Sequence, residues 1–144
     1  MGKFLFPGDV VALEGRLGAG KTVFAKGVAQ GLGCRKNEVK SPSFILVNIY
    51  RGAVPMFHID FYRLEKKSDL RDLGLEELLY GTGVSVIEWA EKFPEVLPSK
   101  HIFVKLSFAG GNERNIKIQG KGKRAKGIIE KYAHRPEIRG NICR

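Results

Sequence analysis

The chain has 144 residues, 43% of them hydrophobic, and carries 25 Lys and Arg against 15 Asp and Glu. This length suits one domain with its own core, so residues 1–144 are expected to form a single domain. No apolar run reaches the roughly 20 residues of a membrane-spanning helix, and no secretory signal pattern is present. We therefore expect no membrane association and a cytoplasmic location. The distant cysteines Cys34 and Cys143 predict neither a disulfide framework nor a zinc site.

The most informative motif follows the first predicted strand. Residues 10–13 are an apolar run typical of a buried strand, and residues 15–22, GRLGAGKT, match the phosphate-binding pattern G-x-x-x-x-G-K-[ST] at every fixed position. In such a loop, glycines with positive φ let backbone N–H groups point into one concavity that ends at a helix N-terminus. Apolar residues at helical spacing over residues 22–32 predict that helix. This pattern predicts a site for a nucleoside triphosphate.

Two loop side chains have expected roles in that site. Lys21 would contact the β- and γ-phosphates, and the Thr22 hydroxyl would complete the coordination of Mg²⁺. The alternative interpretation is a glycine-rich surface turn between a strand and a helix. The expected nucleotide-binding residues of the loop are Gly15, Leu17, Gly18, Ala19, Gly20, Lys21 and Thr22.

The rest of the chain alternates β-rich and helical patterns, which favours an α/β fold. Runs of β-branched and aromatic residues predict two hairpins and a buried strand, and N-cap and spacing signals predict helices. In chain order the predicted elements are a hairpin at 43–50 and 56–62, short helices at 68–73 and 75–79, a strand at 84–88, a hairpin at 101–108 and 114–119, and a basic closing helix at 123–133.

Three further residues are candidates for the metal side of the site. Asp60 and Glu88 each follow an apolar strand run, where P-loop enzymes place an acid that holds Mg²⁺ or orients the attacking water. A strand that ends in a carboxylate also commonly marks only the boundary with solvent. Ser43 lies between the first helix and the next strand, where its hydroxyl would contact the γ-phosphate or the metal. Its preceding Ser-Pro pair is alternatively a simple turn signal.

The positive charge is concentrated near the C-terminus. Residues 110–144 hold ten Lys and Arg but three acids. Such an asymmetry indicates a surface that meets a phosphate backbone or an acidic partner. A solvated basic tail is an equally good interpretation, because no aromatic residues are interleaved there in an RNA-stacking pattern. The basic segment at about 120–144 is thus a candidate contact for tRNA or for protein.

Four motifs together carry a family resemblance. They are residues 15–22, residues 40–44 (KSPSF), residues 58–64 (HIDFYRL) and residues 86–89 (VIEW). In order and approximate spacing the chain resembles the TsaE family over most of its length. The resemblance implies a small bacterial ATPase that works with the TsaD–TsaB pair to make N6-threonylcarbamoyladenosine at position 37 of tRNAs that read ANN codons. It also implies a P-loop NTPase-like three-layer fold, with a mixed, largely parallel sheet flanked by helices and an antiparallel hairpin.

The resemblance also implies residue roles, with ATP and Mg²⁺ as cofactors. Ser43 and Trp89 join the nucleotide-binding set. Arg16 departs from the family by replacing an acid common at that loop position, and Ser43 stands where the family usually has Thr. The implied catalytic residues are Lys21, Asp60 and Glu88, and the implied metal-site residues are Thr22, Ser43, Asp60 and Glu88.

Two other function classes stay open beside the ATPase. A small-molecule kinase of the P-loop class would need an Arg-bearing lid and an acceptor pocket, and neither is identified in the sequence. A nucleotide-gated binding subunit would regulate its partners without turnover. A GTPase is disfavoured because the chain has no N-K-x-D motif. The expected partners are TsaD-like and TsaB-like proteins.

Overall fold

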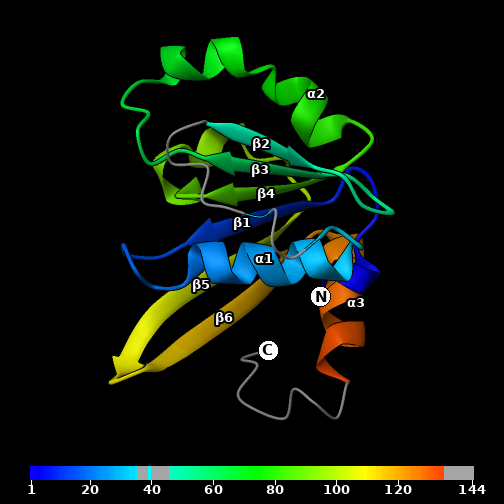
Figure 1. Cartoon of the computed structure of the whole chain (residues 1–144), viewed down its shortest axis with the longest axis vertical. Helices are drawn as coiled ribbons and strands as arrows, with labels where there is room; N and C mark the ends of the chain where they lie inside the picture. Colours follow the sequence, from blue (N-terminus) through cyan, green and yellow to red (C-terminus); the bar gives the residue numbers. More distant parts are fainter. Residues whose placement is uncertain (36–38, 40–45, 135–144) are drawn as a thin grey trace.

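The computed structural model of the chain describes residues 1–35, 39 and 46–134. Its centre is a six-stranded sheet in the order β2-β3-β4-β1-β5-β6 (Figure 1). The strands are β1 (Val10–Glu14), β2 (Val47–Tyr50), β3 (Met56–Asp60), β4 (Val84–Glu88), β5 (His101–Gly110) and β6 (Glu113–Lys121). The α-helices are α1 (Lys21–Gly31), α2 (Leu75–Tyr80) and α3 (Lys123–Ala133), and the 3-10 helices are η1 (Gly2–Phe4), η3 (Lys67–Leu73), η4 (Ala90–Lys92) and η5 (Pro94–Val96).

The sheet is mixed and mostly parallel. Strands β3, β4, β1 and β5 run parallel, while β2 and β6 each pair antiparallel with the neighbouring strand. The two antiparallel pairs confirm the predicted hairpins, although β3 ends at Asp60 rather than at residue 62 and residues 43–45 of the first hairpin lie outside the described residues. The central strands β1 and β4 are buried along almost their whole length, which is why they read as nearly continuous apolar runs.

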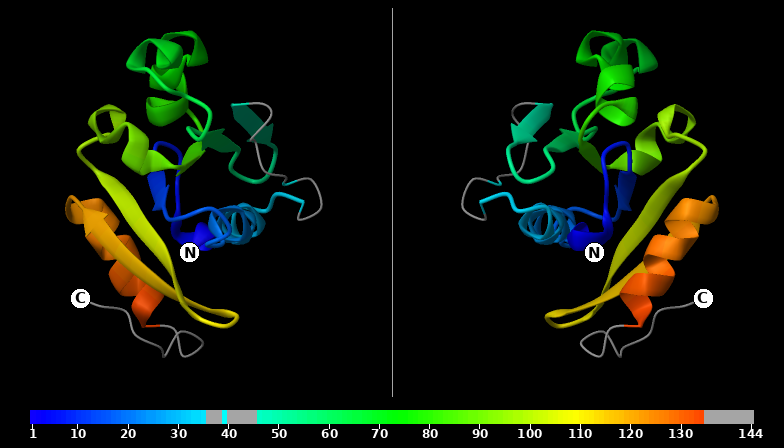
Figure 2. Two further views of the ribbon diagram at one scale, coloured as in Figure 1. Left: turned by 90° about the vertical axis from the view of Figure 1, so that its left-hand side faces the viewer. Right: turned by 90° about the vertical axis from the view of Figure 1, so that its right-hand side faces the viewer.

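Helices cover both faces of the sheet, which makes three layers. Along β1, Val11 and Leu13 belong to one buried cluster together with residues of α1 and α3. Val10 and Ala12 point the other way and belong to a second cluster with residues of η3 and α2. This alternation follows from the two-residue period of a strand, and Figure 2 shows the layers from the side.

One predicted helix has a different form. Residues 67–73 make a 3-10 helix, η3, where the sequence predicts an ordinary short helix. The Asp69 carboxylate accepts the backbone N–H groups of Glu65 and Lys66 at 3.0 and 2.9 Å, which tightens the first turn. Gly74, with φ of 59°, then ends η3 and starts α2 in a new direction. Within the described ranges, no helix is long and apolar enough to cross a membrane.

The parallel strands place acids at one edge of the sheet. Residue Asp60 at the end of β3 is the register partner of Glu88 at the end of β4, and Leu13 of β1 is the partner of Glu88 on the other side. The loop that follows β1 leads directly into α1. Ligands of open α/β sheets bind at the carboxyl ends of the strands, so this edge is where a site is expected.

Candidate nucleotide-binding site

The loop between β1 and α1 depends on its glycines. Gly15, Gly18 and Gly20 have φ of 156°, 76° and 105°, in the region that residues with a side chain rarely adopt. A Cβ at Gly15 would lie 2.6 Å from the carbonyl oxygen of Leu106 in β5. Gly20 is the N-cap of α1, and the fully buried Ala19 anchors the loop in the core. The loop is therefore fixed in a shape that exposes the start of α1.

The Lys21 ammonium lies inside this loop. Its Nζ donates to the carbonyl oxygens of Gly15 at 2.5 Å and Arg16 at 3.0 Å, and lies 3.9 Å from the centre of the Trp89 ring. Burial lowers the pKa of Lys21 from its ordinary value, while the negative charge of Glu88 acts in the opposite direction. The partners of the ammonium are two carbonyl oxygens and a ring face, which are neutral, and an ammonium forms stronger hydrogen bonds with an anion.

A chain of hydrogen bonds joins three elements at the edge of the sheet. The Thr22 hydroxyl in α1 lies 2.8 and 3.1 Å from the two carboxylate oxygens of Glu88 in β4. Nε2 of His58 in β3 lies 2.8 Å from Glu88 Oε1. Glu88 is only 3% exposed and His58 is fully buried. These hydrogen bonds hold the carboxylate of Glu88 against the hydroxyl of Thr22.

The two ring nitrogens of His58 have different surroundings. Its Nδ1 is buried and has no hydrogen-bond partner among the described residues. A proton on Nδ1 would leave a buried donor unpaired, which costs more than an unpaired lone pair. Nε2 is therefore the ring nitrogen that donates to the carboxylate of Glu88.

Asp60 lies beside Glu88 and shapes the turn after β3. Its side chain is buried, and its Oδ1 accepts the backbone N–H of Tyr62 at 2.8 Å. The Tyr62 ring lies 5.0 Å from the ring of Trp89, centre to centre. Trp89 has φ of 58°, the only positive φ of a residue other than glycine in the described chain. Such strain is commonly retained at functional sites.

These groups line one pocket of about 280 Å³. It is slightly smaller than the typical small-molecule pocket of about 300 Å³ or more. Its lining residues are Leu17, Gly18, Gly20, Lys21, Thr22, Val23, Asp60, Tyr62, Glu88 and Trp89.

Thr22 and Glu88 are the residues of this pocket that could hold Mg²⁺ together with phosphate oxygens. Within the described residues, no group of three or more His, Cys, Asp or Glu side chains is placed to hold a metal. Mg²⁺ is usually bound through one or two carboxylates, with phosphate oxygens and water as its other ligands. The hydroxyl of Thr22 beside the carboxylate of Glu88 fits that kind of site.

Comparison with known proteins decides the family. The family model described as "Threonylcarbamoyl adenosine biosynthesis protein TsaE" matches residues 1–116. The chain belongs to the TsaE family. A Bacillus subtilis (strain 168) protein named "tRNA threonylcarbamoyladenosine biosynthesis protein TsaE" is 42% identical over 136 residues, which cover 94% of this chain and 84% of that protein. A Treponema pallidum protein of the same name is 42% identical over 118 residues, covering 82% of this chain and 87% of that protein.

A solved structure supports the fold of this TsaE family member. The structure described as "Crystal structure of Bacillus subtilus YdiB" is similar, with a TM-score of 0.75 and 36% sequence identity. The match covers 92% of this chain and 81% of that one. The predicted P-loop-like α/β fold and the family resemblance are both confirmed.

The structure brings most of the predicted site residues together. Gly15 and Ala19 do not line the pocket: the Gly15 carbonyl accepts a hydrogen bond from Lys21, and Ala19 is a fully buried residue of the loop. Ser43 lies outside the described residues. The pocket itself contains Leu17, Gly18, Gly20, Lys21, Thr22, Asp60, Glu88 and Trp89.

Sequence reasoning missed the part that His58 plays at the site of this TsaE protein. The sequence analysis names His58 only as part of the motif at residues 58–64, whereas the structure pairs it with the candidate metal-side acid Glu88. The signal was available, because His58 and Asp60 are two residues apart in β3 and thus lie on the same face of the strand. Tyr62 and Val23 also line the pocket without a prediction.

Replacing His58 by phenylalanine is expected to lower the free energy of unfolding by about 1–3 kcal/mol, because Glu88 then loses a buried donor. His58→Gln keeps an N–H donor on the side chain and should lose less. Urea unfolding measures both values. If nucleotide affinity is retained while turnover falls in His58→Phe and recovers in His58→Gln, His58 is a positioning residue. Equal stability and turnover in all three proteins would contradict this.

Proposed function

We propose that this chain is a Mg²⁺-dependent ATPase that supports a TsaD–TsaB pair in the N6-threonylcarbamoyladenosine modification of tRNA. Membership of the TsaE family supports the pathway, since its relatives are named for tRNA threonylcarbamoyladenosine biosynthesis. The observation that supports ATPase activity is that Lys21, Thr22 and Glu88 lie together at the loop between β1 and α1. A cytoplasmic location, where tRNA is modified, is part of the proposal.

Nucleotide binding would use the loop and its lysine. The backbone N–H groups at the start of α1 carry the positive end of the helix dipole, which favours phosphate. Lys21 already lies within the loop, bonded to two carbonyl oxygens. Phosphate oxygens are stronger partners for an ammonium than neutral carbonyls, so we expect Lys21 to transfer its hydrogen bonds to the nucleotide.

Turnover would depend on the two buried acids. Mg²⁺ would be held by Thr22 and Glu88 and would neutralise charge on the phosphates. Glu88 and Asp60 are adjacent in register, so either carboxylate would be near a water approaching the phosphate. The hydrogen bond from His58 would keep Glu88 in one orientation. Catalysis would thus come from positioning and electrostatics, with no covalent intermediate on the protein.

The surroundings of the loop support docking of a protein partner. Leu17 and Val23 beside the pocket are largely exposed, at 73% and 72%. Phe108 at the end of β5 is 49% exposed, and its ring would lie 3.9 Å from a Cβ at Gly18. Exposed apolar side chains that gather in one place mark interaction surfaces. A TsaD-like or TsaB-like partner would cover these exposed side chains, and its binding would respond to the nucleotide in the adjacent pocket.

Phe108→Ser is expected to weaken binding to the TsaD–TsaB pair by about tenfold, because a half-exposed aromatic ring is a typical anchor of an interface. Affinity for ATP by the isolated chain should stay within about threefold of the parent. Tyr80→Ser, at a 68% exposed ring on α2, is the matched control and should bind the pair normally. Binding of both variants to surface-immobilised TsaD–TsaB is the measurement. An equal loss of affinity in both would show that the exposed side chains beside the pocket are not a specific contact surface.

The proposed function is tested by measuring ATP affinity and ATP hydrolysis with and without the TsaD–TsaB pair and tRNA. Hydrolysis stimulated by the complex would support the proposal. Phosphorylation of an added small molecule would instead indicate a kinase. Absence of nucleotide binding under all conditions would overturn the proposal as a whole.

A further inference from the structure

A second hollow lies away from the loop, between η1 and α3. Its volume is about 650 Å³. Five of its described lining residues are Lys or Arg, and none is acidic. The lining residues are Lys3, Phe4, Phe6, Lys100, Lys123, Arg124, Gly127, Ile128 and Lys131, which we call the basic groove.

The basic groove lies at the opposite end of the sheet from the nucleotide-binding loop. Lys100 immediately precedes the start of β5 at His101, and Phe6 precedes β1. The loop follows the other ends of these parallel strands. Figure 1 shows α3 and the N-terminal segment together, below the sheet edge formed by the beginnings of the strands. The two sites therefore share no lining residue.

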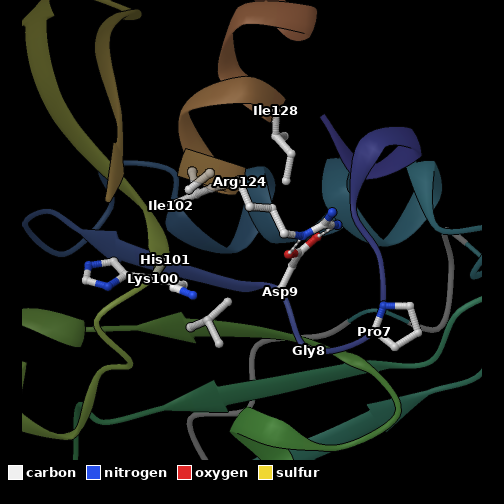
Figure 3. Close-up of a pocket in the computed structure, with 10 residues that line it drawn as sticks. Pro7, Gly8, Asp9, Lys100, His101, Ile102, Arg124 and Ile128 are labelled. Carbon is white, nitrogen blue, oxygen red and sulfur yellow. Dashed lines mark hydrogen bonds and ion pairs between the residues drawn. The ribbon is translucent and has the colours of Figure 1, made fainter. Parts of the chain in front are cut away.

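An ion pair at the groove neutralises one of its cations. The Arg124 guanidinium makes two hydrogen bonds to the carboxylate of Asp9, at 2.7 and 2.8 Å, and lies 5.1 Å from the ring of Phe6. Figure 3 shows Arg124 reaching from α3 to Asp9, just before β1, and both residues line an adjoining pocket of about 200 Å³. This pair fixes the wall of the groove and leaves the lysines as its net charge.

Four lysines supply that net charge. Lys3, Lys100, Lys123 and Lys131 are all exposed, and none forms an ion pair with another described residue. They come from η1, from the turn before β5 and from both ends of α3. The N-terminus of α3 adds to their field, because its N-cap has no side-chain hydrogen bond and its dipole is positive there.

An exposed aromatic ring stands among these charges. Phe6 is 60% exposed. Cations that follow a groove, together with an aromatic side chain on which a base stacks, are the usual means of holding single-stranded nucleic acid. An acidic protein would match the same charge, and it is one of the outcomes that the test below distinguishes. The relatives named for tRNA modification favour RNA over DNA.

We propose that the basic groove binds an unpaired segment of RNA, with the four lysines on phosphates and Phe6 against a base. The proposal extends the tRNA role proposed above, but it does not require ATP hydrolysis. About four phosphate contacts predict that the logarithm of the binding constant falls with the logarithm of salt concentration with a slope of about −3.

The test uses the full chain and an unmodified tRNA transcript, with fluorescence anisotropy as the measurement. Lys100→Glu combined with Lys131→Glu is expected to weaken binding at least about 30-fold, since two phosphate contacts become repulsions. Phe6→Ala is expected to weaken it at least about fivefold. The matched control, Lys67→Glu with Lys117→Glu, changes the net charge equally at exposed positions outside the groove and should stay within about threefold.

Three other results would each contradict the proposal, for different reasons. Equal losses in the groove and control variants would mean that binding follows net charge alone. No tRNA binding by the parent protein at low salt would exclude an RNA groove. Loss of TsaD–TsaB binding with unchanged tRNA binding would reassign the groove to a protein partner. The nucleotide affinity of each variant, compared with that of the parent protein, shows whether the variant is folded.

A separate variant distinguishes this proposal from the ATPase. Lys21→Ala lies at the other end of the sheet and is expected to bind tRNA as the parent does. If the parent fails to hydrolyse ATP but binds tRNA through the groove, only the ATPase proposal fails. If hydrolysis is normal and tRNA binding does not depend on the groove, only the present proposal fails.

Discussion

Replacing Lys21 by alanine is expected to weaken ATP binding at least about 100-fold, which removes it in most assays. Lys21 is the one ammonium placed inside the phosphate-binding loop among the described residues, 3.0 Å or less from the carbonyls of Gly15 and Arg16. A charged hydrogen bond contributes about 1.5–3 kcal/mol, and a lysine that contacts two phosphates makes more than one. Alanine is also a good helix former, so α1 should persist.

Calorimetric titration with Mg²⁺–ATP measures the effect of Lys21→Ala without using Trp89, whose ring the lysine contacts. Lys26→Ala is the matched control, because it removes a lysine five residues later in α1 that does not line the pocket. The control should bind ATP with the parent's affinity. Parental affinity in Lys21→Ala with an unchanged melting temperature would show that the loop does not bind phosphate.

Glu88→Gln is expected to slow ATP hydrolysis at least about 100-fold, a loss typical of removing a positioned acid or base. It should also raise the Mg²⁺ concentration needed for half-maximal activity, since the amide carries no charge to hold the ion. The carboxylate touches both Thr22 and His58. The amide keeps the size of the side chain, so affinity for ATP at saturating Mg²⁺ should fall less than turnover.

Asp60→Asn is the companion variant to Glu88→Gln. Its oxygen can still accept the N–H of Tyr62, so the turn after β3 should be kept while the charge is lost. Phosphate release measures hydrolysis, and urea unfolding checks that both variants are folded. Hydrolysis at the parental rate in both would remove the two acids from the mechanism.

The Glu88→Gln protein also separates an ATPase from a nucleotide-gated binding subunit. In a reconstituted reaction with the TsaD–TsaB pair and tRNA, a variant that binds ATP but cannot hydrolyse it should support at most a single round of modification. Multiple turnovers at the parental rate would show that binding alone is sufficient. The single tryptophan, Trp89, lies against Lys21 and offers a fluorescence signal for nucleotide binding in this variant.

Much of the fold could be predicted from local patterns. The strand at 84–88, both hairpins and the helix at 123–133 are found where apolar periodicity and turn residues placed them. The segment at 67–73 shows the limit of such patterns. Its spacing predicts an ordinary helix, whereas the segment is a 3-10 helix that starts at the contacts of Asp69 and ends at the left-handed Gly74. Local propensity does not decide between these two forms in so short a segment.

The sequence by itself determined the glycine-rich loop between β1 and α1, because glycines, Lys21 and Thr22 at fixed spacing encode a local backbone shape. It also determined the family, through four ordered motifs. Only the tertiary structure decided that Asp60 and Glu88 are register partners, that His58 holds Glu88, and that η1, the turn before β5 and α3 enclose one basic groove. These relations join residues far apart in the chain, and strand order and helix packing, which no local pattern specifies, bring them together.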